Sequence, residues 1–154
     1  MMKQGIPYQV VRGLEFFQRK EVKDLLSYLQ LINNPSNDVA FNRVVNLPAR
    51  GIGKTSLQHV INHAQRYQLT MLEACREAGL IESLSKRAAT AINKFVTLID
   101  VLTASIHMPV SELLIDVVDE TGYGDFVDAQ DAKADEDRRG NVDELINAAR
   151  EFER

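Results

Sequence analysis

The stretch Leu47–Leu57, LPARGIGKTSL, raises the first question about both the fold and the function. Its last residues, GKTS, resemble the end of a phosphate-binding P-loop, G-x-x-x-x-G-K-[ST]. That pattern requires a glycine five residues before Gly53, and Pro48 stands at that position. A P-loop also follows a buried strand, whereas the apolar residues before this turn have helical spacing: Val39, Phe41, Val44 and Val45. We therefore exclude an ATP site in this stretch.

What remains is a glycine turn that opens a helix. Gly51 and Gly53 lie between Arg50 and Lys54, and the residues that follow place apolar groups on one helical face: Leu57, Val60, Ile61 and Ala64. Glycine allows positive φ and close approach of the backbone, and the first N–H groups of a helix are unpaired, so the turn suits an anion.

The form G-[IV]-G is typical of helix-hairpin-helix modules, which donate turn amides to nucleic-acid phosphates without reading bases. We predict a DNA-binding site formed by Arg50, Gly51, Ile52, Gly53, Lys54, Thr55 and His59. The alternative is a purely structural interhelical turn, with Ile52 filling the core and no ligand.

Charge is distributed unevenly along the chain. The net charge is −4, but residues 39–72 contain no acid and carry four basic side chains: Arg43, Arg50, Lys54 and Arg66. Residues 112–137 carry ten acids and a single lysine. A basic pole and an acidic pole would orient the domain on a polyanion.

Length and composition indicate one domain. The chain has 154 residues, of which 45% are apolar, and this can bury the core of one medium domain. Cys75 is the only cysteine, so no internal disulfide can form and we expect it to pack as a small apolar group in a reducing compartment. With neither a signal peptide nor a membrane span in the sequence, we expect no membrane partner and a cytoplasmic location, associated with the bacterial nucleoid when on DNA.

The apolar pattern predicts a mainly α multi-helix bundle with a short β segment near the N-terminus. Residues 8–17 hold β-branched and aromatic residues around Arg12-Gly13, which predicts two short strands. Helices are predicted over about 19–33, 37–46, 54–67, 70–79, 83–106, 109–121 and 141–152. Residues 123–140 are polar and acidic and predict a mobile loop.

Catalytic and metal chemistry find no support in the sequence. His59 and His63 have the spacing of an H-E-x-x-H zinc motif, but Val60 occupies the glutamate position. The acidic segment lacks the spacing of a calcium-binding loop. The aromatic residues have core spacing rather than that of base-stacking platforms: Phe16, Phe17, Tyr28, Phe41 and Phe95.

The first third of the chain resembles UvrD/Rep/PcrA-type superfamily 1 DNA helicases, at the passage from motor subdomain 2A to accessory subdomain 2B. The first set of matching residues is Pro7, Tyr8, Gly13, Phe16, Phe17, Arg19, Glu21, Lys23, Asp24, Tyr28 and Leu29. The second set is Asp38, Phe41, Arg43, Asn46, Pro48, Arg50, Gly51, Ile52, Gly53 and Leu57. A looser match, at Arg139, Asn141, Glu144 and Leu145, resembles the return from 2B to 2A. Arg12 and Gln30 depart from the family pattern, in which a glycine and an arginine stand.

The resemblance implies three parts: residues 1–17 as the edge of 2A, 18–138 as the helical subdomain 2B, and 139–154 as the helix leading back to 2A. It implies a duplex-gripping regulatory subdomain of an ATP-dependent 3′-to-5′ DNA helicase of repair or replication. ATP and Mg²⁺ would bind elsewhere in the parent, so this piece alone would have no cofactor and no hydrolase activity. Its expected partners are double-stranded DNA, the rest of the motor (1A, 1B and 2A) and a repair or replication protein.

Two other classes of protein stay open at this point. A free-standing helix-hairpin-helix repair factor would usually carry a second hairpin, and residues 80–154 show none. A helical protein-interaction module would use the GIG turn only as a structural link.

Overall fold

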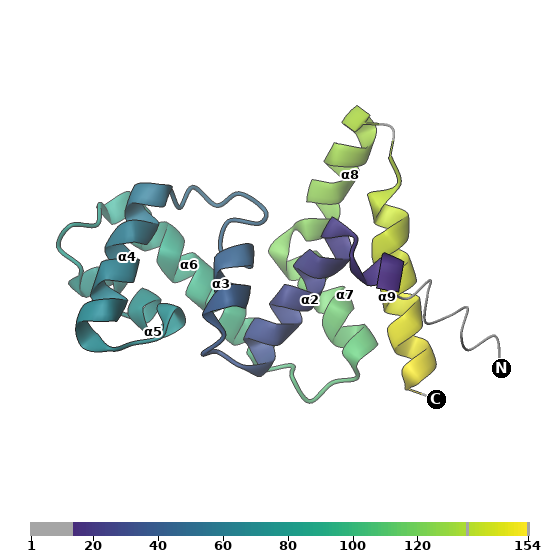
Figure 1. Ribbon diagram of the computed structural model, residues 1–154, viewed down its shortest axis with the longest axis horizontal. Helices are drawn as coiled ribbons and strands as arrows, with labels where there is room; N and C mark the ends of the chain where they lie inside the picture. Colours follow the sequence, from purple (N-terminus) through teal and green to yellow (C-terminus); the bar gives the residue numbers. More distant parts are fainter. Residues whose placement is uncertain (1–13, 135, 154) are drawn as a thin grey trace.

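The computed structural model describes residues 14–134 and 136–153, which form helices joined by short loops (Figure 1). The elements are α2 (Lys20–Asn33), α3 (Asp38–Val44), α4 (Lys54–Tyr67), α5 (Met71–Arg76), the 3₁₀ turn η1 (Ala78–Leu80), α6 (Lys86–Thr103), α7 (Val110–Thr121), α8 (Tyr123–Ala134) and α9 (Arg138–Phe152). None of the described residues lies in a strand. The predicted mainly α class is confirmed.

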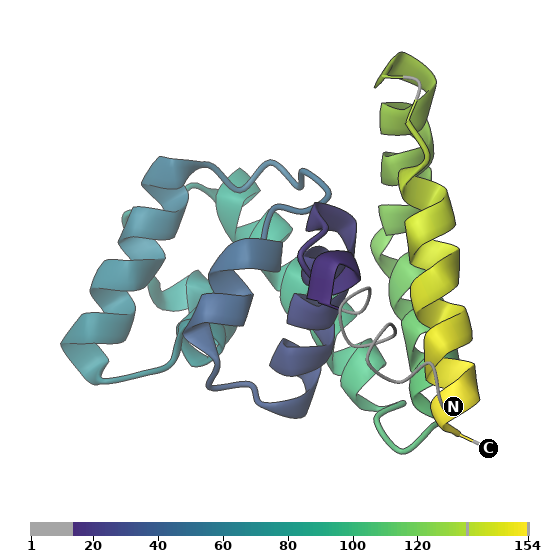
Figure 2. The ribbon, with the colours of Figure 1, turned by 45° about the vertical axis from the view of Figure 1, so that its right-hand side comes forward.

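The helices form two groups that share α2 and α6. On one side, α4 packs on α5 and α5 on α3 and α6; on the other, α9 packs along both α7 and α8. Figure 1 shows the first group at the left and the second at the right, and Figure 2 shows α8 rising beside α9 as a projecting arm. Helix α2 packs against α3, α6, α7 and α9 and so joins the two groups.

Apolar stripes at helical spacing build one continuous core. On α6, Ile92, Phe95, Ile99 and Leu102 face inward and are essentially inaccessible to solvent. The ring of Phe95 meets that of Phe41 on α3 edge-on, with centroids 5.7 Å apart. Four of the five aromatics predicted to pack in the core are buried, whereas Phe17 is 44% exposed.

The prediction of strands over residues 8–17 is wrong for the part that the structure describes. Residues 14–17 form a helical turn, and residues 8–13 lie outside the described chain. Phe16 is buried on this turn and Leu14 is exposed. The β-branched and aromatic composition indicated strands, but propensity yields to packing in so short a segment.

The prediction of a loop over residues 123–140 is also wrong, because Tyr123–Ala134 form α8. Tyr123 and Val127, one turn apart, are fully buried, and α8 packs against α7 and α9. The Tyr123 hydroxyl donates to the buried carboxylate of Asp24 on α2 over 2.6 Å. Two apolar anchors on a polar helix give too weak a period to be seen in sequence, so tertiary packing stabilises α8.

Helix α9 begins earlier than predicted. Asp137 caps it by accepting from Gly140 N, so Asn141, the first residue of the predicted helix, lies within the helix. Asn141 accepts from Arg19 and donates to the buried Glu21 on α2. The start of α2 and the start of α9 are therefore held side by side.

Candidate nucleic-acid interface

Nine residues, 45–53, connect α3 to α4 and contain the GIG sequence. Gly51 adopts φ +78°, in the left-handed region that favours glycine, and the Leu47–Pro48 peptide is cis. Ile52 is 2% exposed and packs into the core, whereas the two glycines beside it are exposed. The buried isoleucine between two exposed glycines fixes the turn to the helices while its backbone stays accessible.

The side chain of Asn46 holds this connection in shape. Its Oδ1 accepts hydrogen bonds from the backbone N–H of Ile52 at 3.2 Å and of Arg50 at 3.4 Å. Its Nδ2 donates to the carbonyl oxygen of Ile52. The Asn46 side chain thus pairs with both the N–H and the C=O of Ile52, as a neighbouring β-strand would. It does not occupy the backbone N–H groups of the residues that follow.

The guanidinium of Arg50 points into the protein. Its Nη1 donates to the carbonyl oxygens of Val44 at 2.8 Å and Val45 at 2.9 Å, at the C-terminal end of α3. Its Nη2 donates to the Tyr28 hydroxyl. Its central carbon lies 5.0 Å from the centroid of the Phe95 ring. This arginine caps the C-terminal end of α3, where a cation is favourable.

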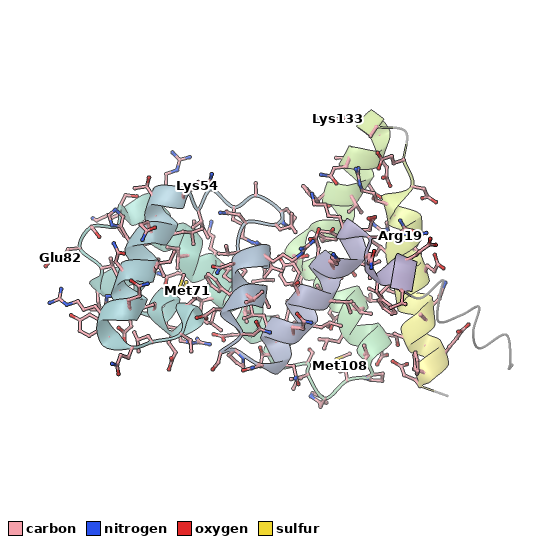
Figure 3. The ribbon with its side chains drawn as sticks, viewed as in Figure 1. Arg19, Lys54, Met71, Glu82, Met108 and Lys133 are labelled. Atoms are coloured by element: carbon pink, nitrogen blue, oxygen red, sulfur yellow. The ribbon has the colours of Figure 1, made fainter. Side chains whose placement is uncertain are left out.

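The start of α4 has the opposite character. Gly53 is its N-cap and supplies no side-chain acceptor, and the first turn contains no acid. Lys54 and Thr55 are exposed there, and Figure 3 shows Lys54 at the upper edge of the molecule. The first backbone hydrogen bond of this helix runs from Leu57 N to Gly53 O, so the N–H groups of residues 53–56 have no acceptor among the described residues. These groups and Lys54 form a cationic site open to an anion.

The helices joined by the turn do not form a close pair. Helix α3 packs mainly on α2, and α4 packs mainly on α5. A helix-hairpin-helix would pack its two helices on each other, so the likeness is limited to the turn and the start of α4.

His59 lies one helical turn beyond Thr55, on the same face of α4. It lines a groove of about 520 Å³ together with Arg66, Tyr67 and Leu80. His63 in the same groove bonds through Nε2 to Glu77 at 2.8 Å. The structure therefore brings together residues 50–55 of the predicted site and places His59 one turn further along α4, in a second groove.

A second basic feature, missed in the sequence, adjoins the turn. A groove of about 780 Å³ is lined by Arg50 and, on α6, by Lys86, Arg87, Thr90 and Lys94. Positions 86, 90 and 94 are spaced by four and share one helical face. The spacing can be seen in the sequence, but only the fold shows that the side chains at positions 86, 90 and 94 lie beside Arg50. Among the described residues that line the groove, Glu120 is the only acid.

Comparison with known proteins identifies the family. The family model of the UvrD-like helicase C-terminal domain matches residues 1–154. The chain belongs to this family. It is 34% identical over 154 residues to the ATP-dependent DNA helicase PcrA of Bacillus subtilis and 38% identical over 153 residues to DNA helicase II of Escherichia coli. Each alignment covers 99% of this chain and 21% of the relative, so the chain spans about a fifth of the length of these helicases.

Part of the acidic segment of this UvrD-like chain lies on the projecting arm. Helix α8 carries Asp125, Asp128 and Asp131, and Asp131 accepts from the backbone N–H of both Arg138 and Arg139 at the start of α9. Helix α8 packs on α7 and α9, whereas α4 packs on α5. The acids of the arm and the start of α4 therefore lie on different parts of the fold.

Neither metal nor thiol chemistry is supported in the described part of this UvrD-like chain. Residues 14–134 and 136–153 contain no group of three His, Cys, Asp or Glu residues placed to hold a metal ion. Cys75 is fully buried, and burial raises the pKa of its thiol to about 12. A buried neutral thiol is a packing residue, as predicted. No described helix is long and apolar enough to cross a membrane.

Proposed function

We propose that this chain is the 2B accessory subdomain of an ATP-dependent 3′-to-5′ DNA helicase and that it grips the backbone of duplex DNA. The family and the helicase names of its relatives support this role. The observation that carries it is the start of α4, which is uncapped and free of acids and follows Arg50, a residue that lines a basic groove. An isolated domain would gain stability from an acid or a capping side chain there.

In the proposed mechanism one phosphate accepts hydrogen bonds from the free N–H groups of residues 53–56. Lys54 adds charge, and the hydroxyl of Thr55 adds a further donor. Lys86 and Lys94 would contact neighbouring phosphates along the groove. All these groups meet the backbone rather than base edges, so binding would be independent of sequence. We place Arg50 outside the direct phosphate contacts because its guanidinium points inward, and His59 outside them because it lines a second groove one turn further along α4.

The proposed attachment to the motor uses the paired starts of α2 and α9. Arg19 bonds to Asn141 and lies 4.0 Å from Glu144, so the chain would leave and rejoin the motor at adjacent points. The motor subdomains 1A, 1B and 2A would supply ATP and Mg²⁺ binding, and this piece alone would not hydrolyse ATP. We propose that the parent acts in the cytoplasm on nucleoid DNA, in repair or replication, with a further protein partner.

Fluorescence anisotropy with a labelled blunt duplex and a matching single strand at low salt tests this function. The Gly53→Val variant is compared with the unaltered chain. Gly53 has φ −74°, and no atom lies within 4 Å of the place that a β-carbon would take there, so the variant should fold. Non-specific affinities of roughly 10⁻⁴ to 10⁻⁶ M set the concentration range.

Duplex binding that exceeds single-strand binding, and that falls at least tenfold in the folded variant, would support the phosphate site. A folded chain that binds neither DNA, or a variant that binds as well as the unaltered chain, would contradict it. That result would favour a helical protein-interaction module in which the GIG turn is only a structural link.

A further inference from the structure

We propose that Tyr28 is a positioning residue for the phosphate-binding turn and that it acts through Arg50; this rests on the proposed function. Tyr28 thereby gains a role beyond that of the core aromatic residue which the sequence indicated. Arg50 changes from a phosphate contact to a support of the turn.

The Tyr28 hydroxyl lies where three parts of the chain meet. The ring is fully buried on α2, yet its oxygen reaches the connection between α3 and α4. It donates to the carbonyl oxygen of Leu47 and lies 3.4 Å from that of Val44. It also accepts from Nη2 of Arg50. One hydroxyl thus ties the end of α3, the middle of the connection and the residue before Gly51 to α2.

The Arg50 side chain makes the remaining contacts that hold the connection between α3 and α4. It bonds the carbonyls of Val44 and Val45 at the end of α3 and lies over the Phe95 ring of α6. A phenylalanine at position 28 would fill the same volume but would leave Nη2 of Arg50 and the Leu47 carbonyl without this partner. Buried groups that lose a partner retain their desolvation cost, so the connection would become less well defined.

The backbone of the turn links this contact set to the ligand. Arg50 and Ile52 both donate backbone N–H groups to Asn46, and the free amides begin at the next residue, Gly53. A phosphate site made of backbone amides gains affinity when these amides are held in place before the ligand arrives. Tyr28 and Arg50 therefore position donors that they do not themselves provide.

The protonation state suits this role. Burial raises the pKa of Tyr28 above its ordinary value, against the opposing effect of the Arg50 cation, so the hydroxyl stays protonated at neutral pH. It can therefore donate to Leu47 while it accepts from Arg50.

The experiment compares Tyr28→Phe with Tyr67→Phe, which removes the same hydroxyl from a 54% exposed tyrosine of α4. Duplex affinity is measured against salt concentration at a temperature where circular dichroism shows both variants folded. We expect Tyr28→Phe to lose about three- to tenfold in affinity, as for one lost hydrogen bond, with an unchanged salt slope. Tyr67→Phe should match the unaltered chain.

A second series separates positioning from phosphate contact. Arg50→Gln removes the charge and the paired donors, and we expect it to lose affinity as Tyr28→Phe does, with an unchanged slope because Arg50 does not contact a phosphate. Lys54→Ala, which removes a proposed phosphate contact, should lower the slope by about one. A merely structural role for Tyr28 would lower the melting temperature and leave the affinity of the folded chain unchanged.

Hydrogen exchange without DNA provides a readout that is independent of the ligand. We expect faster exchange of the Ile52 amide in Tyr28→Phe and unaltered exchange in the α6 core. Unchanged affinity and unchanged Ile52 exchange in Tyr28→Phe would overturn the proposal, as would a salt slope that falls by about one in Arg50→Gln. If the unaltered chain bound no duplex, the proposed function would fail, and Ile52 exchange would still decide whether Tyr28 holds the turn.

Discussion

The starts of α4 and α5 differ sharply although the two helices pack on each other. Helix α5 begins with a complete capping box, in which Thr70 Oγ1 accepts from Glu73 N and Glu73 accepts from Thr70 N. Asp38 on α3 also accepts from Met71 N at 3.0 Å. Helix α4 begins with a glycine, a lysine and no acceptor.

The difference shows where the described residues satisfy their own polar groups and where they leave backbone N–H groups without an acceptor. At α5 two carboxylates and a hydroxyl lie on the positive end of the helix dipole, which stabilises it. At α4 the same end carries Lys54, which is unfavourable for the isolated helix but favourable for a bound anion. Three side chains support the α4 turn through hydrogen bonds on the protein side of it: Asn46, Arg50 and Tyr28.

The largest expected effect on stability is at Gly51, in the turn before α4. Gly51→Ala should lower the free energy of unfolding by about 1–2 kcal/mol, because φ +78° is unfavourable for a residue with a β-carbon. Gly53→Ala is the matched control and should change it by less than about 0.5 kcal/mol, since its backbone is ordinary and its surroundings are open. Urea unfolding measures both, and equal losses would contradict the turn geometry.

The second prediction concerns the capping box at the start of α5. Thr70→Ala should cost about 1 kcal/mol of stability, because Glu73 N loses its acceptor. Duplex affinity of the folded variant should not change. A loss of DNA binding comparable to that of the Gly53 variants would show that the two helix starts are not functionally distinct.

A smaller effect separates charge at the α4 start from charge elsewhere. Lys54→Ala should weaken duplex binding about three- to tenfold and lower the salt slope by about one, whereas Lys133→Ala on the acidic arm should change neither. Anisotropy titrations over a salt series measure both values. A Lys133 effect as large as that of Lys54 would indicate diffuse attraction without a defined site.

The weakest effect is a loss of stability at alkaline pH. It arises because weak acids are buried, among them the thiol of Cys75 on α5 and the hydroxyl of Tyr28, which contacts the connection before α4. The folded pKa of Cys75 on α5 is raised from 9.0 to about 12, and that of Tyr28 is raised from 10.0. Both groups favour the folded state while protonated, so their stabilisation is complete below pH 9 and is lost as pH rises above it. At pH 9 the loss should be below about 1 kcal/mol.

Cys75→Ala should remove the earlier part of this decline, which begins near pH 9, and retain the part due to Tyr28 and Tyr123, whose pKa values burial also raises. Unfolding curves from about pH 8 to about pH 10.5 measure it. A native thiol that reacts with an aromatic disulfide reagent as fast as a free thiol would contradict the burial of Cys75.

The sequence predicted the helices whose apolar residues recur every three or four positions, such as α2 and α6. It did not predict α8, whose buried anchors are Tyr123 and Val127 and whose other residues are mostly polar. Such a helix depends on partners far along the chain, and local patterns carry no information about them.

The candidate site shows the same division. The two glycines and Lys54 could be proposed from the sequence because their effect is local to the turn, and their role in binding stays a prediction. The inward orientation of the Arg50 side chain was not predicted. The sequence of a basic residue beside a glycine turn is the same whether the side chain contacts a ligand or the carbonyl oxygens at the end of α3. The groove with Lys86 required the fold to bring α6 beside residue 50.

The sharpest test gives α4 the kind of cap that α5 already has. In the Gly53→Asp variant a carboxylate would accept from the free amides of α4, and Asn62→Asp, on an exposed position of the same helix, is the control for charge. Duplex affinity and the free energy of unfolding are measured on both variants. We expect Gly53→Asp to gain about 0.5–1 kcal/mol of stability and to lose at least tenfold in duplex affinity, well beyond the effect of Asn62→Asp. Equal duplex binding by the two variants would show that the open start of α4 is not the phosphate site.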